Sequence, residues 1–500
     1  MSNTSFGRRE FLKATGLAVL SAASAGAGRL AWAGQQGPPL AARKSLSDVV
    51  VLLPGITGSV LRKDNQELWG LSTASVLQAI RTLGRSINTL KLNEDPPDVA
   101  DLGDGVTADH LFPDVHLIPG FWKIDGYTKV SQRIAREFDV VPGRNFFEFP
   151  YDWRRDNRVA ARRLARMSHD WLKAWREQSG KNNAQLILVA HSMGGLVSRY
   201  FLECLEGWRD TRMLITFGTP YRGSLNALNF LSNGLTKQLG GLDVVDLTAL
   251  LRSFTSVYQL LPIYPCYDPG DGTLVRIGET ADIPGVNLAR AAAALAFHRE
   301  IEHAVDAHLK DETYLKNRYA IHPIVGTYQP TFQSAKLLAD KVELSTNHPH
   351  YPDLDGDGTV PKPSATPLEL DGGIGVFVAE RHGSLQNADP VLVQLAGLLS
   401  GLPPDGFREA SAVSLRIDDA YVAGESITIH SRCQSDAMQL TAVVVNVHTG
   451  CEVARQRMHA GANNEHEAEF APLSEGTYRI TISDQGSAGS VSDVFLVSGK

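Results

Sequence analysis

The stretch LILVAHSMGGLVSRYFLE, residues 186–203, decides the fold of this chain. It begins as an aliphatic run typical of a buried strand, turns at a group of small residues and continues with the apolar spacing of a helix. Ser192 stands at the turn, with Ala190 two positions before it and Gly194 two positions after it. Only small residues fit beside so tight a turn, which strains the serine and exposes its hydroxyl. We predict a nucleophilic serine here; the alternative is an ordinary small-residue turn.

The surrounding sequence repeats the same alternation of buried strand and amphipathic helix. Its apolar runs lie at residues 49–55, 145–153, 186–190, 213–220, 319–328 and 373–380. This pattern predicts an α/β fold, with a doubly wound, mostly parallel sheet over residues 45–401 that is covered on both faces. Two insertions, near residues 62–121 and 225–317, are expected to form a helical cap.

The character of the sequence changes after Gly401. Residues 402–410 are rich in proline and glycine and predict a linker. From residue 411 to residue 500, short runs of alternating apolar and polar residues are separated by turn residues. This texture predicts a separate β-sandwich accessory domain.

The first 33 residues read as an export signal. Arg8 and Arg9 precede a mild apolar run that ends in Ala31-Trp32-Ala33, a small-residue cleavage pattern. The paired arginines resemble a twin-arginine signal, although Gly7 leaves the general export route open. The run is shorter than the ~20 residues that span a bilayer, so we expect a periplasmic or extracellular protein without a transmembrane span.

Charge and cysteine content exclude several classes of partner. Residues 1–33 hold four basic residues and one acidic residue, so their removal changes the formal net charge from −7 to −10. An acidic chain without a basic block is not expected to bind nucleic acid. The four cysteines show no metal-binding spacing. Whether Cys433 and Cys451 pair stays open.

A nucleophilic serine needs a base and an orienting acid, and in this fold they follow the serine in the order acid, then histidine. His382 is the only histidine between residue 359 and the linker, and it directly follows an apolar run. The acid is expected from DLDGDGTVP, residues 353–361, which offers Asp353, Asp355 and Asp357.

The same acidic stretch resembles the start of an EF-hand calcium loop. The twelfth position of that loop holds Ser364 where calcium needs a bidentate glutamate, and Pro361 and Pro363 oppose the helix that should follow. We therefore expect no cofactor and no metal. Calcium bound by these carboxylates in another geometry remains the alternative.

Several motifs resemble the lecithin:cholesterol acyltransferase family and occur in its order. They are PGITGS at 54–59, PYDWR at 150–154, the Ser192 turn, FGTP at 217–220, SVYQLLP at 256–262, GT at 326–327, GDGTV at 356–360 and RH at 381–382. The chain looks like a bacterial member of that group over about residues 48–401. The resemblance implies an α/β-hydrolase fold and covers neither the signal nor the β-sandwich.

The family's functional positions carry over to this sequence as expectations. Ser192 would be the nucleophile, Asp357 the acid and His382 the base. The oxyanion hole would use the backbone amide of Met193 and one in the loop at 54–59, that of Ile56 or, preferably, Thr57.

Two features depart from the family. Ala190 replaces the usual glycine, and the first insertion lacks the cysteines that close the lid of the animal enzymes. We interpret PYDWR at 150–154 as structural, since an aspartate near an arginine at a strand end usually holds a loop.

These observations predict a serine esterase, lipase or O-acyltransferase that works through an acyl-enzyme on lipid or other carboxylic esters, with an alcohol as a further acceptor. The cap is expected to contact a lipid surface through the apolar stripe Val76, Leu77, Ile80, Leu83 and Ile87. Two alternatives stay open. One is a polyester or glycan esterase whose β-sandwich docks the substrate, and the other is a binding protein that kept the fold without turnover.

Overall fold

The structure is a computed structural model. It describes residues 43–64, 66–69, 89–118, 122–239, 242–279, 282–350, 355–370, 375–402, 412–434, 438–484 and 489–499. Three predictions fall outside these residues: the export signal at 1–33, the apolar stripe between residues 76 and 87, and most of the linker at 402–410. Within the part that is described, no helix is long and apolar enough to cross a membrane.

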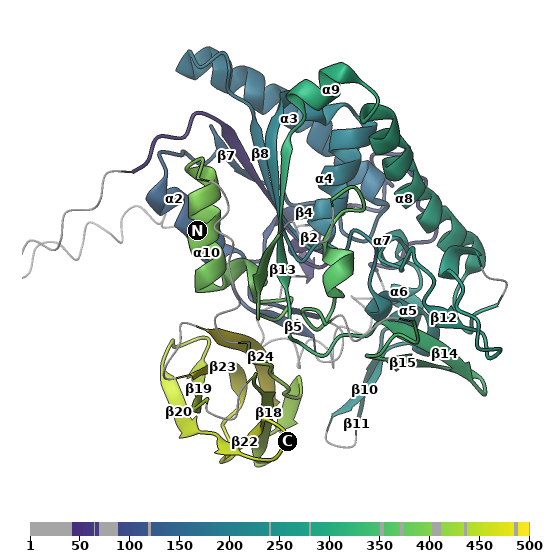
Figure 1. The fold of residues 1–500 in the computed structure, drawn as a ribbon, viewed down its shortest axis with the longest axis vertical. Helices are drawn as coiled ribbons and strands as arrows, with labels where there is room; N and C mark the ends of the chain where they lie inside the picture. Colours follow the sequence, from purple (N-terminus) through teal and green to yellow (C-terminus); the bar gives the residue numbers. More distant parts are fainter. Residues whose placement is uncertain are drawn as a thin grey trace, which may run out of the picture. The chain divides into compact units, whose positions relative to one another are not determined.

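A six-stranded sheet forms the centre of the region predicted as α/β, residues 45–401 (Figure 1). Its strands, in spatial order, are β16 (Val376–Val378), β13 (Ala320–Gly326), β9 (Thr211–Phe217), β8 (Leu186–His191), β1 (Val49–Leu53) and β7 (Phe146–Glu148). Every pairing in this sheet is parallel. β1 and β8 are buried at every residue, because both faces of the sheet are covered.

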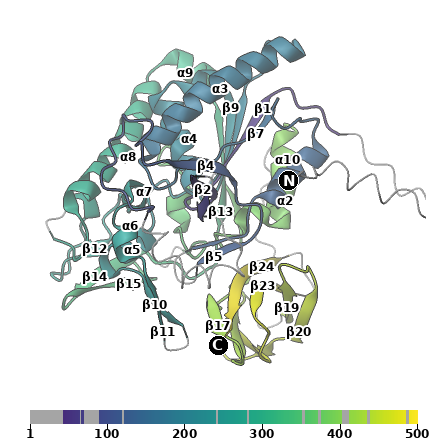
Figure 2. The same ribbon diagram turned by 180° about the vertical axis from the view of Figure 1, so that it is seen from behind.

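Helices lie on both faces of this sheet, with α3, α4 and α8 on one side and α2 and α10 on the other (Figures 1 and 2). Their bounds are α2 (Thr128–Glu137), α3 (Asn157–Ser179), α4 (Met193–Cys204), α8 (Leu288–His308), α9 (Glu312–Asn317) and α10 (Asp389–Leu399). Short 3-10 helices occur at Gly207–Asp210, Ile277–Glu279, Lys362–Ala365 and Leu385–Asn387. The predicted α/β-hydrolase architecture is therefore confirmed.

The insertion near 62–121 forms strands in the residues that the structure describes. β2 (Ser59–Lys63) pairs with β3 (Gln66–Trp69) and β4 (Val106–Leu111), and β5 (His116–Ile118) pairs with β6 (Trp122–Ile124). All of these pairings are antiparallel, so this part of the insertion forms small sheets beside the central one.

The insertion near 225–317 is mainly helical. Its further elements are α5 (Leu225–Asn233), the hairpin β10 (Thr236–Leu239) and β11 (Leu242–Asp246), α6 (Thr248–Leu251), α7 (Thr255–Gln259) and β12 (Tyr267–Asp268). β12 joins β14 (Ser334–Leu338) and β15 (Lys341–Ser345) in a small sheet. α8 packs against α4, so the insertion also extends the helical layer.

The C-terminal region forms a β-sandwich with its own hydrophobic core, as predicted. One sheet has the order β17 (Ala420–Val422), β24 (Ser490–Ser498), β23 (Gly476–Asp484), β19 (Leu440–Asn446) and β20 (Glu452–Arg457). The other has the order β18 (Ile427–Arg432), β22 (Glu465–Phe470) and β21 (His459–Ala460). Cys433 is buried in this region and Cys451 is exposed, and no disulfide joins the two.

Residues 412–417, which alternate like a strand in the sequence, form only two isolated bridges in the structure. Val413 bridges Cys433 and Arg416 bridges His430. The backbone of Val413 and Leu415 is hydrogen-bonded to the side chain of Gln329, which follows β13.

Candidate active site

Ser192 lies in the sharp turn between β8 and α4. Its φ of 51° and ψ of −124° are a strained backbone conformation for a residue with a side chain. The Ser192 amide donates to the Phe217 carbonyl at 2.9 Å, which ties the turn to the neighbouring strand. A Cβ on Gly55 would lie 2.9 Å from the Ser192 Cβ, so only glycine lets the loop after β1 approach the serine this closely.

His382 and Asp357 form a hydrogen-bonded series with Ser192. The Nε2 atom of His382 lies 2.9 Å from Ser192 Oγ, and its Nδ1 atom lies 2.7 Å from Asp357 Oδ2. The other oxygen of Asp357 accepts from the amides of Thr359 and Val360, at 2.9 and 2.7 Å. The structure thus brings together three side chains that the sequence spreads over 190 positions.

This geometry assigns the protons of the imidazole. A carboxylate can only accept, so Nδ1 carries the proton toward Asp357, and Nε2 is left with a lone pair that faces the Ser192 hydroxyl. All three side chains are buried, at 2% exposure for Ser192, 1% for Asp357 and 4% for His382. The arrangement can move the serine proton to Nε2 while the buried carboxylate stabilises the resulting cation.

The other candidate acids lie differently. Asp355 accepts from the amide of Gly356 and has a positive φ of 67°. Asp353 is outside the described residues. In the part of the chain that is described, no group of three or more His, Cys, Asp or Glu side chains is arranged to hold a metal ion.

The loop at 54–59, which carries Thr57, is held by the PYDWR motif. The Tyr151 hydroxyl donates to the Pro54 carbonyl at 2.9 Å, and the Trp153 indole donates to the Ser59 carbonyl at 3.0 Å. Thr57 is fully buried with a φ of 59°, and Met193 is the first residue of α4. These contacts agree with the structural role expected of residues 150–154.

Two residues near the serine were missed by the sequence reasoning. The Gly55 amide donates to the Tyr127 hydroxyl at 2.8 Å, and this oxygen lies 2.9 Å from His191 Nδ1. His191 Nε2 lies 3.1 Å from the carbonyl of His382. Because a carbonyl can only accept, Nε2 is the protonated nitrogen and Nδ1 accepts from Tyr127.

The hydrogen bonds of Tyr127 and His191 therefore join the loop of Thr57 to the loop of His382. Burial, with the nearby His382, lowers the pKa of His191 to about 3, so its imidazole is neutral at physiological pH. His191 was visible in the sequence as a neighbour of the serine. Tyr127, at the N-cap of α2, stands in no motif that could have pointed to it.

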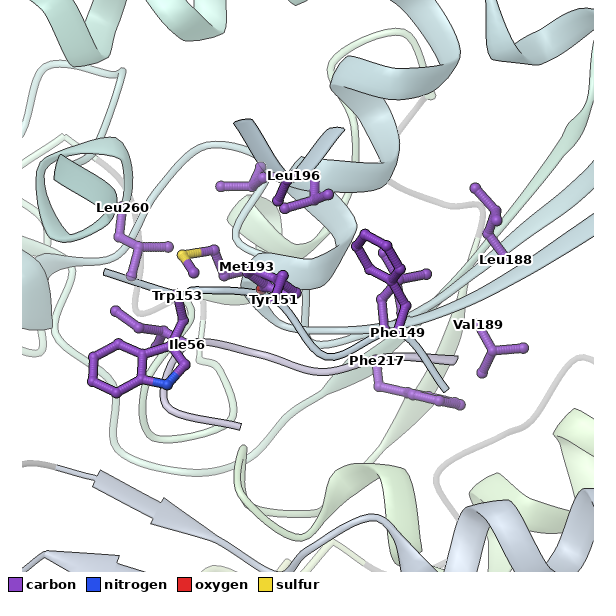
Figure 3. Close-up of a cluster of buried hydrophobic side chains, with 14 of the residues drawn as sticks. Ile56, Phe149, Tyr151, Trp153, Leu188, Val189, Met193, Leu196, Phe217 and Leu260 are labelled. Carbon is purple, nitrogen blue, oxygen red and sulfur yellow. The ribbon is translucent and has the colours of Figure 1, made fainter. Parts of the chain in front are cut away.

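Two hollows of different character meet at this site. A narrow one of about 20 Å³ reaches Ser192 and is mostly apolar; its lining includes Ile56, Ala227, Phe230, Val257, Leu260 and Val360. In Figure 3, Ile56, Trp153, Met193 and Leu260 gather in the cluster at the start of α4. The second, of about 240 Å³, reaches His382 and has a polar lining that includes Lys123, Asn229, Arg381, Asp419 and Asp493.

Comparison with known proteins gives matches to part of the chain. Residues 120–281 match the family model for lecithin:cholesterol acyltransferase. This segment contains Ser192 but neither Asp357 nor His382. An uncharacterised protein of Saccharomyces cerevisiae is 29% identical over 173 residues, which is 34% of this chain and 23% of that protein.

The lysosomal phospholipase A and acyltransferase of Bos taurus is 28% identical over 34% of this chain and 40% of its own length. The chain thus matches less than half of the length of these relatives. Among solved structures, a Bacillus licheniformis lipase in its propeptide form has 16% identity and a TM-score of 0.30, covering 92% of this chain and 75% of that one. The family match and the curated relatives agree with the motifs, and over residues 120–281 the chain is similar to the lecithin:cholesterol acyltransferase family.

Proposed function

We propose that this chain is a serine-dependent acyl-ester hydrolase or acyltransferase that acts on lipid or other carboxylic esters. The observation that carries the proposal is the buried series from Asp357 through His382 to the strained Ser192, with distances of 2.7 and 2.9 Å. The names of the mammalian relatives, which combine a phospholipase with an acyltransferase, support the same reaction class.

The reaction would proceed through an acyl-enzyme. His382 Nε2 takes the proton of Ser192 as its Oγ attacks the ester carbonyl carbon, and the amides of Met193 and Thr57 donate to the oxyanion. The tetrahedral intermediate collapses, the bond to the alcohol oxygen breaks, and His382 returns the proton to that oxygen. Water or a second alcohol then attacks the acyl group by the same steps in reverse and releases Ser192.

The two hollows suggest how the ester lies. The apolar one at Ser192 suits the acyl group, and the polar one at His382 suits the alcohol, because His382 has to reach the alcohol oxygen with its proton. At about 20 Å³ the apolar hollow is too small for an acyl chain, so lining side chains such as Phe230 and Leu260 have to move when one binds.

Replacement of the serine tests the proposal. Ser192→Ala is expected to reduce turnover of p-nitrophenyl esters by about 10⁴-fold or more, since the nucleophile is lost. A fluorophosphonate probe should label the native chain at Ser192 and leave the variant unlabelled. Ser168→Ala, which removes a buried hydroxyl from α3, is the matched control and should keep both properties. Native turnover in a folded Ser192→Ala protein would overturn the proposal.

The balance between hydrolysis and transfer is read from the products. With a lipid ester and increasing concentrations of a soluble alcohol, a transferase forms the new ester in place of the free acid. A hydrolase releases the acid at every alcohol concentration. Either result is compatible with Ser192 chemistry, and the ratio decides between the two activities.

A further inference from the structure

The β-sandwich contacts the loops that carry His382 and Asp357. Glu380, two residues before His382, is buried, and its Oε1 accepts from the Arg381 amide and from the Ser492 amide, both at 2.9 Å. Ser492 lies in β24, where β17 no longer pairs with that strand. The backbone N–H of Ser492, at the edge of the sandwich, thus donates a hydrogen bond to the carboxyl group of Glu380 in the histidine loop.

Arg381, directly before His382, makes the second contact. Its Nε donates to Asp493 Oδ2 at 2.9 Å, and its guanidinium also donates to the Leu415 carbonyl. Asp493 is 3% exposed, and Lys123 reaches the same oxygen at 2.9 Å. A carboxylate of the sandwich thus lies buried between two cations of the catalytic region, which keeps its charge compensated.

The opposite end of the same loop is tied to the sandwich through Asp125. The amide of Asp125 donates to the Gly383 carbonyl at 2.9 Å. The side chain of Asp125 forms an ion pair with Arg479, which lies in β23. Sandwich residues therefore act on the backbone immediately before His382 and, through Asp125, on the backbone immediately after it.

The acid loop is tied to the sandwich by Gln329. The side chain of Gln329, which is fully buried, donates to the Val413 carbonyl at 3.1 Å and accepts from the Leu415 amide at 3.0 Å. The backbone N–H of Gln329 donates to the backbone carbonyl of Gly356 at 2.9 Å, and Gly356 directly precedes Asp357. One glutamine thus links the start of the sandwich to the residue that precedes the acid.

These contacts differ from those of a module that only docks a substrate. Such a module needs a linker and few contacts with its neighbour. This one shares charged hydrogen bonds with the histidine loop and neutral, buried ones with the acid loop. A misplacement of about 1 Å far from the chemistry can cost about 100-fold in rate, so two such loops need firm support.

We propose that the β-sandwich positions the histidine and acid loops of the active site, with Asp493 and Gln329 as positioning residues. This inference rests on the proposed function. On this proposal, the sandwich affects the rate of the reaction and is not required for adsorption of the substrate.

The test uses two variants of the full chain. Asp493→Ala removes the shared acceptor of Arg381 and Lys123, and Gln329→Leu removes both hydrogen bonds to residues 413–415 at similar volume. Each is expected to lower kcat on a soluble short-chain ester by about 10- to 100-fold, because the reacting groups are misaligned. Gln329→Leu should leave KM nearly unchanged, since Gln329 lines neither hollow, whereas Asp493 also lines the polar one. Glu467→Gln, an exposed carboxylate of β22, is the control and should keep native kcat.

A purely structural role would lower the melting temperature and leave kcat of the folded fraction intact, so circular dichroism accompanies each assay. Asp493→Glu keeps the charge and should recover part of the lost rate. Asp493→Asn is the milder replacement if the alanine variant does not fold. Native kcat in folded Asp493→Asn and Gln329→Leu, or a rise in KM alone, would overturn the inference.

A second readout needs no turnover and separates this inference from the proposed function. The proton on His382 Nδ1, held by Asp357, gives a downfield proton resonance that His382→Ala identifies. We expect this resonance to shift or broaden in Gln329→Leu and Asp493→Ala and to stay unchanged in Glu467→Gln. An unchanged resonance in all three would contradict the positioning role even if no ester proves to be a substrate.

Discussion

The loop of His382 is held from two sides, and the two sides use different chemistry. On the inner side, the chain from Gly55 through Tyr127 to His191 ends on the His382 carbonyl and consists of neutral hydrogen bonds. On the outer side, Arg381 forms an ion pair with Asp493 of the sandwich, and Glu380 bonds an edge amide of that domain.

The two sides also come from different parts of the chain. The inner side uses β8, α2 and the loop after β1, all within the α/β-hydrolase region. The outer side depends on a domain that the family resemblance does not cover. The low pKa of His191 should make the stability of the inner side sensitive to acid. The raised pKa of Glu380 should make the stability of the outer side sensitive to alkali.

The largest effect concerns Asp357, the acid that is hydrogen-bonded to the histidine held by both sides. Asp357→Asn is expected to lower kcat by about 10⁴-fold, because the amide favours the wrong tautomer of His382 and leaves the imidazolium without its counter-charge. Asp355→Asn is the matched control from the same loop and should lose little activity, since Asp355 bonds the Gly356 amide. Steady-state kinetics on p-nitrophenyl esters check this. Equal losses that added calcium restores would point instead to a metal loop.

The next effect breaks the inner side alone. Tyr127→Phe leaves the Gly55 amide and His191 Nδ1 without their buried partner, which should cost about 1–3 kcal/mol of stability. Because this chain links the loop of Thr57 to that of His382, kcat should fall by up to about 100-fold. Tyr478→Phe removes a comparable buried hydroxyl from the sandwich, where it donates to the Ser474 carbonyl, and serves as the control. If Tyr127→Phe is less stable but keeps native kcat, the hydrogen bonds of the inner side contribute to stability alone.

Much of the inner side could be predicted from the sequence. The aliphatic run and small residues of 186–203 fixed the strand, the turn and the helix around Ser192, because these depend on local periodicity and size. His382 followed from its place after the last strand. The choice of Asp357 among three acids needed the family resemblance, since spacing alone does not separate it from Asp355.

The outer side could not be predicted, because its contacts are non-local and chemically ordinary. Glu380 and Ser492 are 112 positions apart, and no motif contains either of them. Arg381 was noticed only as the neighbour of the histidine, and Asp493 looks like any polar residue of an alternating strand. The pattern predicted a sandwich but carried no information about the surface against which it packs, so its role stayed open between docking and support.

The smallest effect concerns the outer side and its response to pH. Burial raises the pKa of Glu380 to about 8; the amides of Ser492 and Arg381 oppose this shift, and the nearby Asp493 and Asp125 add to it. The folded chain therefore keeps a proton that the unfolded chain releases near pH 4.5. Stability from this group is present below pH 4.5 and is lost as the pH rises toward about 8, because the unfolded state binds fewer protons over that interval.

Glu380→Gln removes this dependence, since glutamine stays neutral. Each unit of raised pKa corresponds to about 1.4 kcal/mol, so the variant should gain at least about 1 kcal/mol relative to the native chain between pH 5 and pH 8. Urea unfolding at a series of pH values measures the difference, and Glu469→Gln, an exposed carboxylate of β22, controls for the loss of a charge. Parallel stability curves for the native chain and Glu380→Gln would show that Glu380 is ionised throughout. The stability of the outer side would then be as insensitive to alkali as that of the inner side. The two sides would differ only in the ion pair between Arg381 and Asp493.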